Sequence, residues 1–148
     1  MALNYTFTII KPGAVQHEHI GPILAMINKA GFHIVAMKYT KLTAVQAGAF
    51  YAVHKGKPFY ESLIKFMTSG PVVVAIIEKE NAVTEYRKLM GATNPEEAEE
   101  GTIRKLFAES LQRNAVHGSD SDENAKLESD FFFSKMERYF WGGELSIY

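Results

Sequence analysis

The residues from Val72 to Ile77 read Val-Val-Val-Ala-Ile-Ile, and this unbroken apolar run constrains the fold more than any other stretch. A short continuous run rich in β-branched residues indicates a strand that is buried on both of its faces. Burying such a strand needs a core of some size. A chain of 148 residues with 47% hydrophobic and 12% aromatic content can supply one. The same composition argues against a disordered chain.

Periodicity and turn residues predict the other elements. Residues 5–10 alternate and are rich in Thr, Phe and Ile, which is typical of a strand. Thr43 and Gln46 form a predicted capping box, and Asn81 is a candidate cap for a helix that Gly91 ends. The other expected strands are 32–42 and 115–116, and the other expected helices are 21–30, a segment after Lys57-Pro58, a short segment ending at 111, and 121–133.

The chain shows no internal repeat and no linker, so residues 1–148 are expected to form one α+β domain.

Three local segments add further expectations. Lys11-Pro12-Gly13 is expected to end the first strand as a shaped loop. Asn94 and Pro95 are a candidate cap and first position of a short helical turn. The tail, 134–148, is expected to hold a short helical piece, and no role is assigned to it.

Charge and composition exclude several classes of function. Lys and Arg number 16 against 17 Asp and Glu, so no basic stripe of the kind that binds nucleic acid is expected. The chain has no cysteine, which excludes disulfides and cysteine chemistry. The first residues lack a basic segment followed by a long apolar run, so we expect no signal peptide, and no apolar run approaches the ~20 residues of a membrane span. We therefore expect a cytoplasmic protein without a membrane partner.

The stretch from Asn114 to Ser121, Asn-Ala-Val-His-Gly-Ser-Asp-Ser, is the candidate chemical centre. His117 follows a short apolar pair and precedes a predicted helix start, where Ser119 or Ser121 could cap. Gly118 is expected to allow close approach to a ligand and unusual dihedral angles. A helix N-terminus favours anions, and a histidine there can act as nucleophile or base near neutral pH.

Glu128 is the candidate partner of this histidine. Ser121, Ala125, Glu128 and Phe132 are spaced to share one face of the predicted helix, and side chains lean toward the helix N-terminus. A carboxylate at Glu128 could then accept a proton from one ring nitrogen of His117 and leave the other free to attack. The competing interpretation is a solvated glutamate and a loop histidine with an ordinary hydrogen bond.

This stretch closely resembles the active-site signature of the nucleoside diphosphate kinase family. Further motifs match in order and at the family's spacing, so the resemblance spans nearly the whole chain: Lys11-Pro12, Gly31-Phe32, Lys57-Pro58-Phe59, Ser69 to Val73, Gly91 to Pro95, and Gly101 to Arg104. The resemblance implies a ferredoxin-like antiparallel four-stranded sheet with helices on one face. Gly13-Ala14 and Gln112 depart from the residues of many relatives, which affects loop detail and contacts near the base.

The resemblance also implies an activity: transfer of the γ-phosphoryl group from a nucleoside triphosphate, mainly ATP, to a nucleoside diphosphate. The route is ping-pong through a phosphohistidine on His117, with Glu128 orienting the ring and Ser119 hydrogen-bonded nearby. Low base specificity is expected, since an aromatic stack reads no base edge. The enzyme is expected to be a homo-oligomer, a tetramer or a hexamer.

The implied nucleotide site uses separate side chains, because neither the Gly-x-x-x-x-Gly-Lys-[Ser/Thr] loop nor the Gly-x-Gly-x-x-Gly run is present. Magnesium would be carried mainly by the nucleotide's phosphates and water, with no protein ligand. The implied contacts are Tyr51, Arg87, Thr93, Arg104 and the Gly118 backbone on phosphate, Lys11 and Asn114 at the ribose 3′-hydroxyl, Lys11 also at the leaving oxygen, Phe59 stacked on the base, and Leu63 or Leu111 beside it.

Three other interpretations stay open at this point. One is a non-enzymatic ferredoxin-like module that binds a nucleotide or a regulatory partner. Another is a hydrolase that uses Ser119 or Ser121, although the Gly-x-Ser-x-Gly elbow is absent. The last is a metal site at His17-Glu18-His19, although a structural metal site usually needs four ligands.

Overall fold

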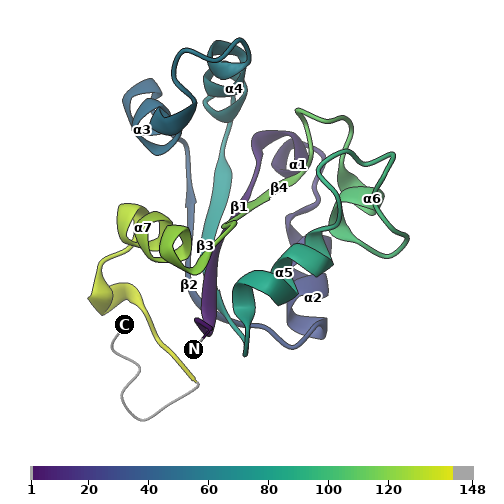
Figure 1. Cartoon of the computed structure of the whole chain (residues 1–148), viewed down its shortest axis with the longest axis vertical. Helices are drawn as coiled ribbons and strands as arrows, with labels where there is room; N and C mark the ends of the chain where they lie inside the picture. The colour runs from purple at the N-terminus through teal and green to yellow at the C-terminus, as the bar shows by residue number, and fades with distance from the viewer. Residues whose placement is uncertain (1, 142–148) are drawn as a thin grey trace.

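The computed structural model describes residues 2–141, which form a sheet with helices packed against it (Figure 1). The strands are β1 (Tyr5–Ile10), β2 (His33–Thr40), β3 (Val72–Glu78) and β4 (Val116–Gly118). The helices are α1 (Pro12–Gln16), α2 (Ile20–Lys29), α3 (Ala44–Phe50), α4 (Tyr60–Met67), α5 (Ala82–Met90), α6 (Ile103–Phe107) and α7 (Asp122–Phe132), with short 3₁₀ turns η1 (Ala52–His54) and η2 (Lys135–Glu137).

The four strands lie in the order β2-β3-β1-β4, and every neighbouring pair is antiparallel. The expected α+β fold with a four-stranded antiparallel sheet is confirmed. β1 and β3 occupy the centre, and every residue of both strands is buried. β4 lies at the edge beside β1, where Ile9 is the partner of His117 and Thr8 is the partner of Gly118.

Helices cover both faces of this sheet, so the expectation of helices on one face is wrong. Successive side chains of a strand point to opposite faces. Ala75 and its neighbours on one face pack with Ile23 of α2 and Tyr86 of α5. Val74 and its neighbours on the other face pack with Ala47 of α3 and Met67 of α4, and α7 lies on this side too (Figure 1). A central strand that is apolar on both faces requires this second layer.

The predicted caps were partly right. Thr43 and Gln46 form the expected capping box of α3, and the Ser121 hydroxyl accepts a hydrogen bond from the Asn124 amide at the start of α7. Asn81 does occupy the N-cap position of α5, but it is left-handed (φ 55°) and its side chain makes no capping bond. The main chain of Asn81 is therefore what starts this helix.

Two boundaries differ from the sequence prediction. α1 follows β1 directly, where we expected a loop, and proline at the start of a helix was the missed signal. α6 ends at Phe107, short of the expected residue 111. Residues 95–97 form the short turn that we expected, and the Asn94 side chain accepts a hydrogen bond from the Glu96 backbone amide at its start.

The last described segment contains the short helical piece expected in the tail, now η2. The rest of the predicted tail, 142–148, lies outside the described residues. Among the helices of residues 2–141, none is long and apolar enough to cross a membrane.

Candidate active site

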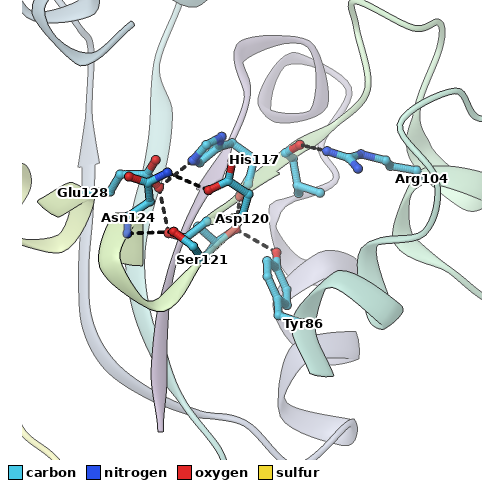
Figure 2. Close-up of polar contacts among 10 residues, drawn as sticks. Tyr86, Arg104, His117, Asp120, Ser121, Asn124 and Glu128 are labelled. Carbon is cyan, nitrogen blue, oxygen red and sulfur yellow. Dashed lines mark hydrogen bonds and ion pairs between the residues drawn. The ribbon is translucent and has the colours of Figure 1, made fainter. Parts of the chain in front are cut away.

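His117 lies within β4, where pairing with Ile9 of β1 fixes its backbone. Its Nε2 atom lies 2.8 Å from Oε1 of Glu128, which extends from α7 toward the ring (Figure 2). The Ser119 hydroxyl donates to the same Oε1 atom at 2.7 Å. The expected geometry of His117, Ser119 and Glu128 is therefore present, with Nδ1 as the ring nitrogen that Glu128 does not hold.

Gly118 is needed for packing, and not for the unusual dihedral angles that we expected. Its φ is not positive. A Cβ atom at this position would lie 2.6 Å from Met90 Cε and 2.9 Å from Tyr86 Cδ2. The left-handed residue of this stretch is Ala115 (φ 73°), where Val116 donates to the Asn114 carbonyl in a tight turn. This strained turn costs ~1–3 kcal/mol and sets where β4 begins.

Lys11 and Asn114 meet on the buried side of this turn. The Lys11 ammonium donates to the Asn114 side-chain oxygen at 2.8 Å, and both residues are buried. Burial, with a smaller contribution from the charge of Arg104, lowers the pKa of Lys11 to about 7. A buried cation with no carboxylate partner in these contacts is suited to an anionic ligand.

Arg104 is also buried, and three backbone carbonyls hold its guanidinium. Its Nε, Nη1 and Nη2 atoms donate to the carbonyls of Asn114, Gly91 and Val116 at 3.3, 3.1 and 2.9 Å. Burial lowers the pKa of Arg104, but a guanidinium stays protonated in proteins. Because it has five N–H donors, it can still donate to a ligand, and its Nη2 bond ends one residue before His117.

Arg104 also lines a cavity of about 440 Å³ between α5 and the start of α6. Arg87 and Thr93 line the same cavity, so three of the predicted phosphate contacts come together there. Both are exposed, unlike Arg104. Glu97 and Glu99 lie on the same walls, so the cavity is of mixed charge.

A family model described as nucleoside diphosphate kinase matches residues 4–138 of this chain. The chain belongs to the nucleoside diphosphate kinase family. It is 58% identical to the nucleoside diphosphate kinase of Flavobacterium psychrophilum over 139 residues, which cover 94% of this chain and 100% of that protein. It is 59% identical to that of Chlorobaculum tepidum over 135 residues, covering 91% and 96% of the two chains.

Solved structures of nucleoside diphosphate kinases share the fold. The Aquifex aeolicus enzyme superposes with a TM-score of 0.89 at 40% identity, covering 91% of this chain and 98% of that one. A halophilic enzyme from Halobacterium salinarum, solved in complex with CDP, also gives 0.89 at 35% identity and 97% coverage of both chains. This chain is accordingly an enzyme of the transferase class, so the interpretation as a non-enzymatic module is wrong.

A row of aromatic rings leads from His117 toward the surface. The rings of Tyr51 and His117 are 6.5 Å apart, Tyr51 and His54 6.3 Å, and His54 and Phe59 5.3 Å. Phe59 is 46% exposed, which leaves its ring available for stacking. Burial and the nearby Glu128 carboxylate raise the pKa of Tyr51, whose hydroxyl has no hydrogen-bond partner among the described residues.

The two leucines expected beside the base differ in setting. Leu63 is partly buried and packs against the core cluster on the α3–α4 side of the sheet. Leu111 is 60% exposed, and its backbone carbonyl accepts a hydrogen bond from the side-chain Nδ2 atom of Asn114 at 3.0 Å. Sequence reasoning missed His54, which lies one helical turn after Tyr51, and Phe50, whose ring lies 5.5 Å from that of His117.

The two remaining interpretations find little support in these contacts. The Ser121 hydroxyl caps α7, and that of Ser119 donates to Glu128, so neither faces the histidine as a nucleophile would. His17 pairs with Glu109 at 2.9 Å and also contacts the Gly13 carbonyl. Within residues 2–141, no three His, Cys, Asp or Glu side chains are grouped as a metal site.

Proposed function

We propose that this enzyme transfers the γ-phosphoryl group from a nucleoside triphosphate, mainly ATP, to a nucleoside diphosphate through a phosphohistidine on His117. The observation that carries the proposal is the 2.8 Å contact between His117 Nε2 and Glu128 Oε1. A carboxylate oxygen only accepts, so Nε2 carries the proton in the neutral ring. The lone pair is then on Nδ1, which is the nucleophilic atom of the proposal.

In the first half-reaction the Nδ1 lone pair forms a bond to the γ-phosphorus. The bond from that phosphorus to the bridging oxygen breaks, and its electron pair leaves with the nucleoside diphosphate. The ring becomes cationic as it accepts the phosphoryl group, and the negative charge of Glu128 stabilises it. The second half-reaction runs the same steps backward with another diphosphate, so the kinetics are ping-pong.

The phosphates would lie between His117 and the cavity lined by Arg87, Thr93 and Arg104. Guanidinium groups suit phosphate because they present a planar fork of donors. Tyr51 adds a buried hydroxyl that has no other partner among the described residues. We also assign the Gly118 backbone to this group, and Mg²⁺ to the nucleotide's phosphates, since the described side chains form no metal cage.

Lys11 and Asn114 are proposed to contact the ribose 3′-hydroxyl region, with Lys11 also neutralising charge on the leaving oxygen. Their 2.8 Å hydrogen bond, in a buried place without a carboxylate in contact, supports this assignment. Phe59 is proposed to stack on the base, with Leu63 or Leu111 beside it. Turnover with ADP, GDP, CDP and UDP should be similar, and rates that differ by orders of magnitude would contradict the stacking role.

The decisive experiment is incubation with γ-³²P-ATP followed by mapping of the labelled residue. We expect acid-labile, base-stable label on His117. The His117→Asn variant should take up no label while it still binds nucleotide, as measured by calorimetry. Acid-stable label on serine would instead support Ser119 or Ser121 as the nucleophile, and absence of label would exclude a covalent intermediate.

We also propose a homo-oligomer, a tetramer or a hexamer, that works in the cytoplasm. The edge strand β2 supports self-association, because Met37 and Tyr39 are 50% and 64% exposed there. Light scattering coupled to gel filtration measures the assembly, and a monomeric mass would overturn this part of the proposal. Cell fractionation tests the compartment.

A further inference from the structure

Two hydroxyl groups on the side of β4 away from Glu128 connect His117 to helix α5. Thr8 on β1 donates through Oγ1 to the His117 carbonyl at 2.8 Å. The same Oγ1 atom lies 2.7 Å from the hydroxyl of Tyr86 on α5. Thr8 and Tyr86 are 1% and 0% exposed, so bulk solvent does not reach either hydroxyl.

The direction of both hydrogen bonds follows from counting protons. A carbonyl oxygen only accepts, so the one hydroxyl proton of Thr8 is directed at His117. The Tyr86 hydroxyl must therefore be the donor to Thr8. Burial raises the pKa of Tyr86 to about 12, so the phenol keeps the proton that it donates.

The Tyr86 end of this chain of hydrogen bonds is held rigidly. Its ring meets that of Phe32 edge-on, at 5.7 Å between centroids. It also packs so close to Gly118 that a Cβ there would lie 2.9 Å away. Close packing therefore holds the Tyr86 hydroxyl in place in the core, on the helix that packs against β4.

We propose that Thr8 and Tyr86 are positioning residues that fix the backbone of His117 while Glu128 fixes its ring. This inference rests on the proposed role of His117 as the phosphoryl acceptor. β4 is a short edge strand that pairs with β1 alone, so the Thr8 bond adds a second restraint on the His117 backbone to the pairing with Ile9. Without the Thr8 bond, the aim of Nδ1 at the phosphorus becomes loose, and a misplacement of ~1 Å can cost about 10²-fold in rate.

The test uses substitutions that remove only the hydroxyl. Thr8→Val and Tyr86→Phe keep the shape of each side chain, and Thr8→Ser keeps the hydroxyl. Thr6→Val is the matched control, because Thr6 lies on the same strand and is 0% exposed, and its Oγ1 has no hydrogen-bond partner within residues 2–141. Rapid-quench measurement of phosphoenzyme formation from ATP gives the rate, and calorimetry gives the Kd for ADP.

We expect Thr8→Val to slow phosphoenzyme formation about tenfold or more, with the Kd for ADP unchanged. Thr8→Ser should restore most of the rate, and Thr6→Val should match the wild type. Because Tyr86 acts through Thr8, Tyr86→Phe should slow the step less, and adding it to Thr8→Val should cost nothing further.

A wild-type rate in Thr8→Val overturns the inference, as does equal loss of rate in Thr8→Ser. If Thr8→Val folds poorly, the rate of phosphoenzyme formation in Tyr86→Phe becomes the test. A wild-type rate in Tyr86→Phe then overturns the proposed positioning role of these hydrogen bonds. A failure of the proposed function looks different, because the wild-type enzyme would then carry no label on His117.

Discussion

His117 and Ser119 donate to one and the same oxygen, Oε1 of Glu128, at 2.8 and 2.7 Å. They lie two residues apart on the chain, so their side chains can both face α7 from the same side of β4. All three side chains are largely shielded from solvent. The carboxylate is thereby held by the serine while it orients the histidine.

The first prediction concerns the charge of Glu128. Glu128→Gln keeps an acceptor oxygen but loses the charge that stabilises the cationic ring, so phosphoenzyme formation should slow by about 10²-fold. Ser119→Ala keeps the charge and should slow it less than tenfold. Rapid-quench kinetics with labelled ATP measure both. Equal losses in the two variants would mean that the hydrogen-bond network, and not the charge, is what matters.

The second prediction concerns the buried ammonium of Lys11 and the pH dependence of stability. Its pKa is about 7 in the folded protein against 10.5 in the unfolded chain. Between these values the unfolded chain binds more protons, so rising pH stabilises the wild type by up to about 1.4 kcal/mol per pH unit. Lys11→Met lacks this dependence.

The measurement for Lys11 is urea unfolding at pH 7 and pH 9. We subtract the free energy of unfolding of Lys11→Met from that of the wild type. This difference should rise by about 2 kcal/mol from pH 7 to pH 9. Exposed Lys29 provides the control, and Lys29→Met should keep a constant difference from the wild type. A pH-independent difference for Lys11→Met would show that the ammonium is not destabilised by burial.

The same group gives a third prediction, on nucleotide binding. At pH 8 most Lys11 side chains are neutral in the free enzyme, and a bound anion raises the pKa of the amine. Binding of ADP should therefore take up a fraction of a proton at pH 8 and less at pH 6. Calorimetry in two buffers of different ionisation enthalpy measures this uptake. Uptake that persists in Lys11→Met would assign it to another group.

A fourth prediction separates the two arginines of the cavity. Arg104 holds three backbone carbonyls, whereas Arg87 is exposed. Arg104→Gln should therefore lower the stability of the nucleotide-free enzyme by about 2–4 kcal/mol, because buried carbonyls lose charged donors. Arg87→Gln should leave stability within about 0.5 kcal/mol and weaken nucleotide binding only. Thermal unfolding without ligand, beside calorimetry with ADP, distinguishes the two effects.

Local patterns predicted the active-site pairing well because its parts are close in sequence. The helical spacing from Ser121 to Glu128 was enough to aim the carboxylate at His117, and the structure has that geometry. The number of strands also followed from local patterns, since each has its own alternation or apolar run. The roles assigned to these residues in catalysis stay predictions until the variants are measured.

Long-range relations could not be read from the same patterns. The bond from Thr8 to His117 depends on the register of β1 with β4, which no local signal specifies. The apolar run of β3 requires a layer on each face, but which helices form the second layer depends on how α3, α4 and α7 pack, which spacing within each helix does not state. Gly118 was misjudged for the same reason, because the atoms that exclude a side chain there come from α5.

The last prediction tests that close approach of α5. Gly118→Ala places a Cβ against Met90 and Tyr86, so overpacking should destabilise the protein by about 1–3 kcal/mol and disturb the neighbouring His117. Gly21 in α2 is the control, because nothing lies within 4 Å of its Cβ position. Gly21→Ala should be neutral or stabilising by up to about 1 kcal/mol through helix propensity. Chemical denaturation compares the two, and a Gly118→Ala protein as stable as Gly21→Ala would show that α5 can move away from β4 at little cost.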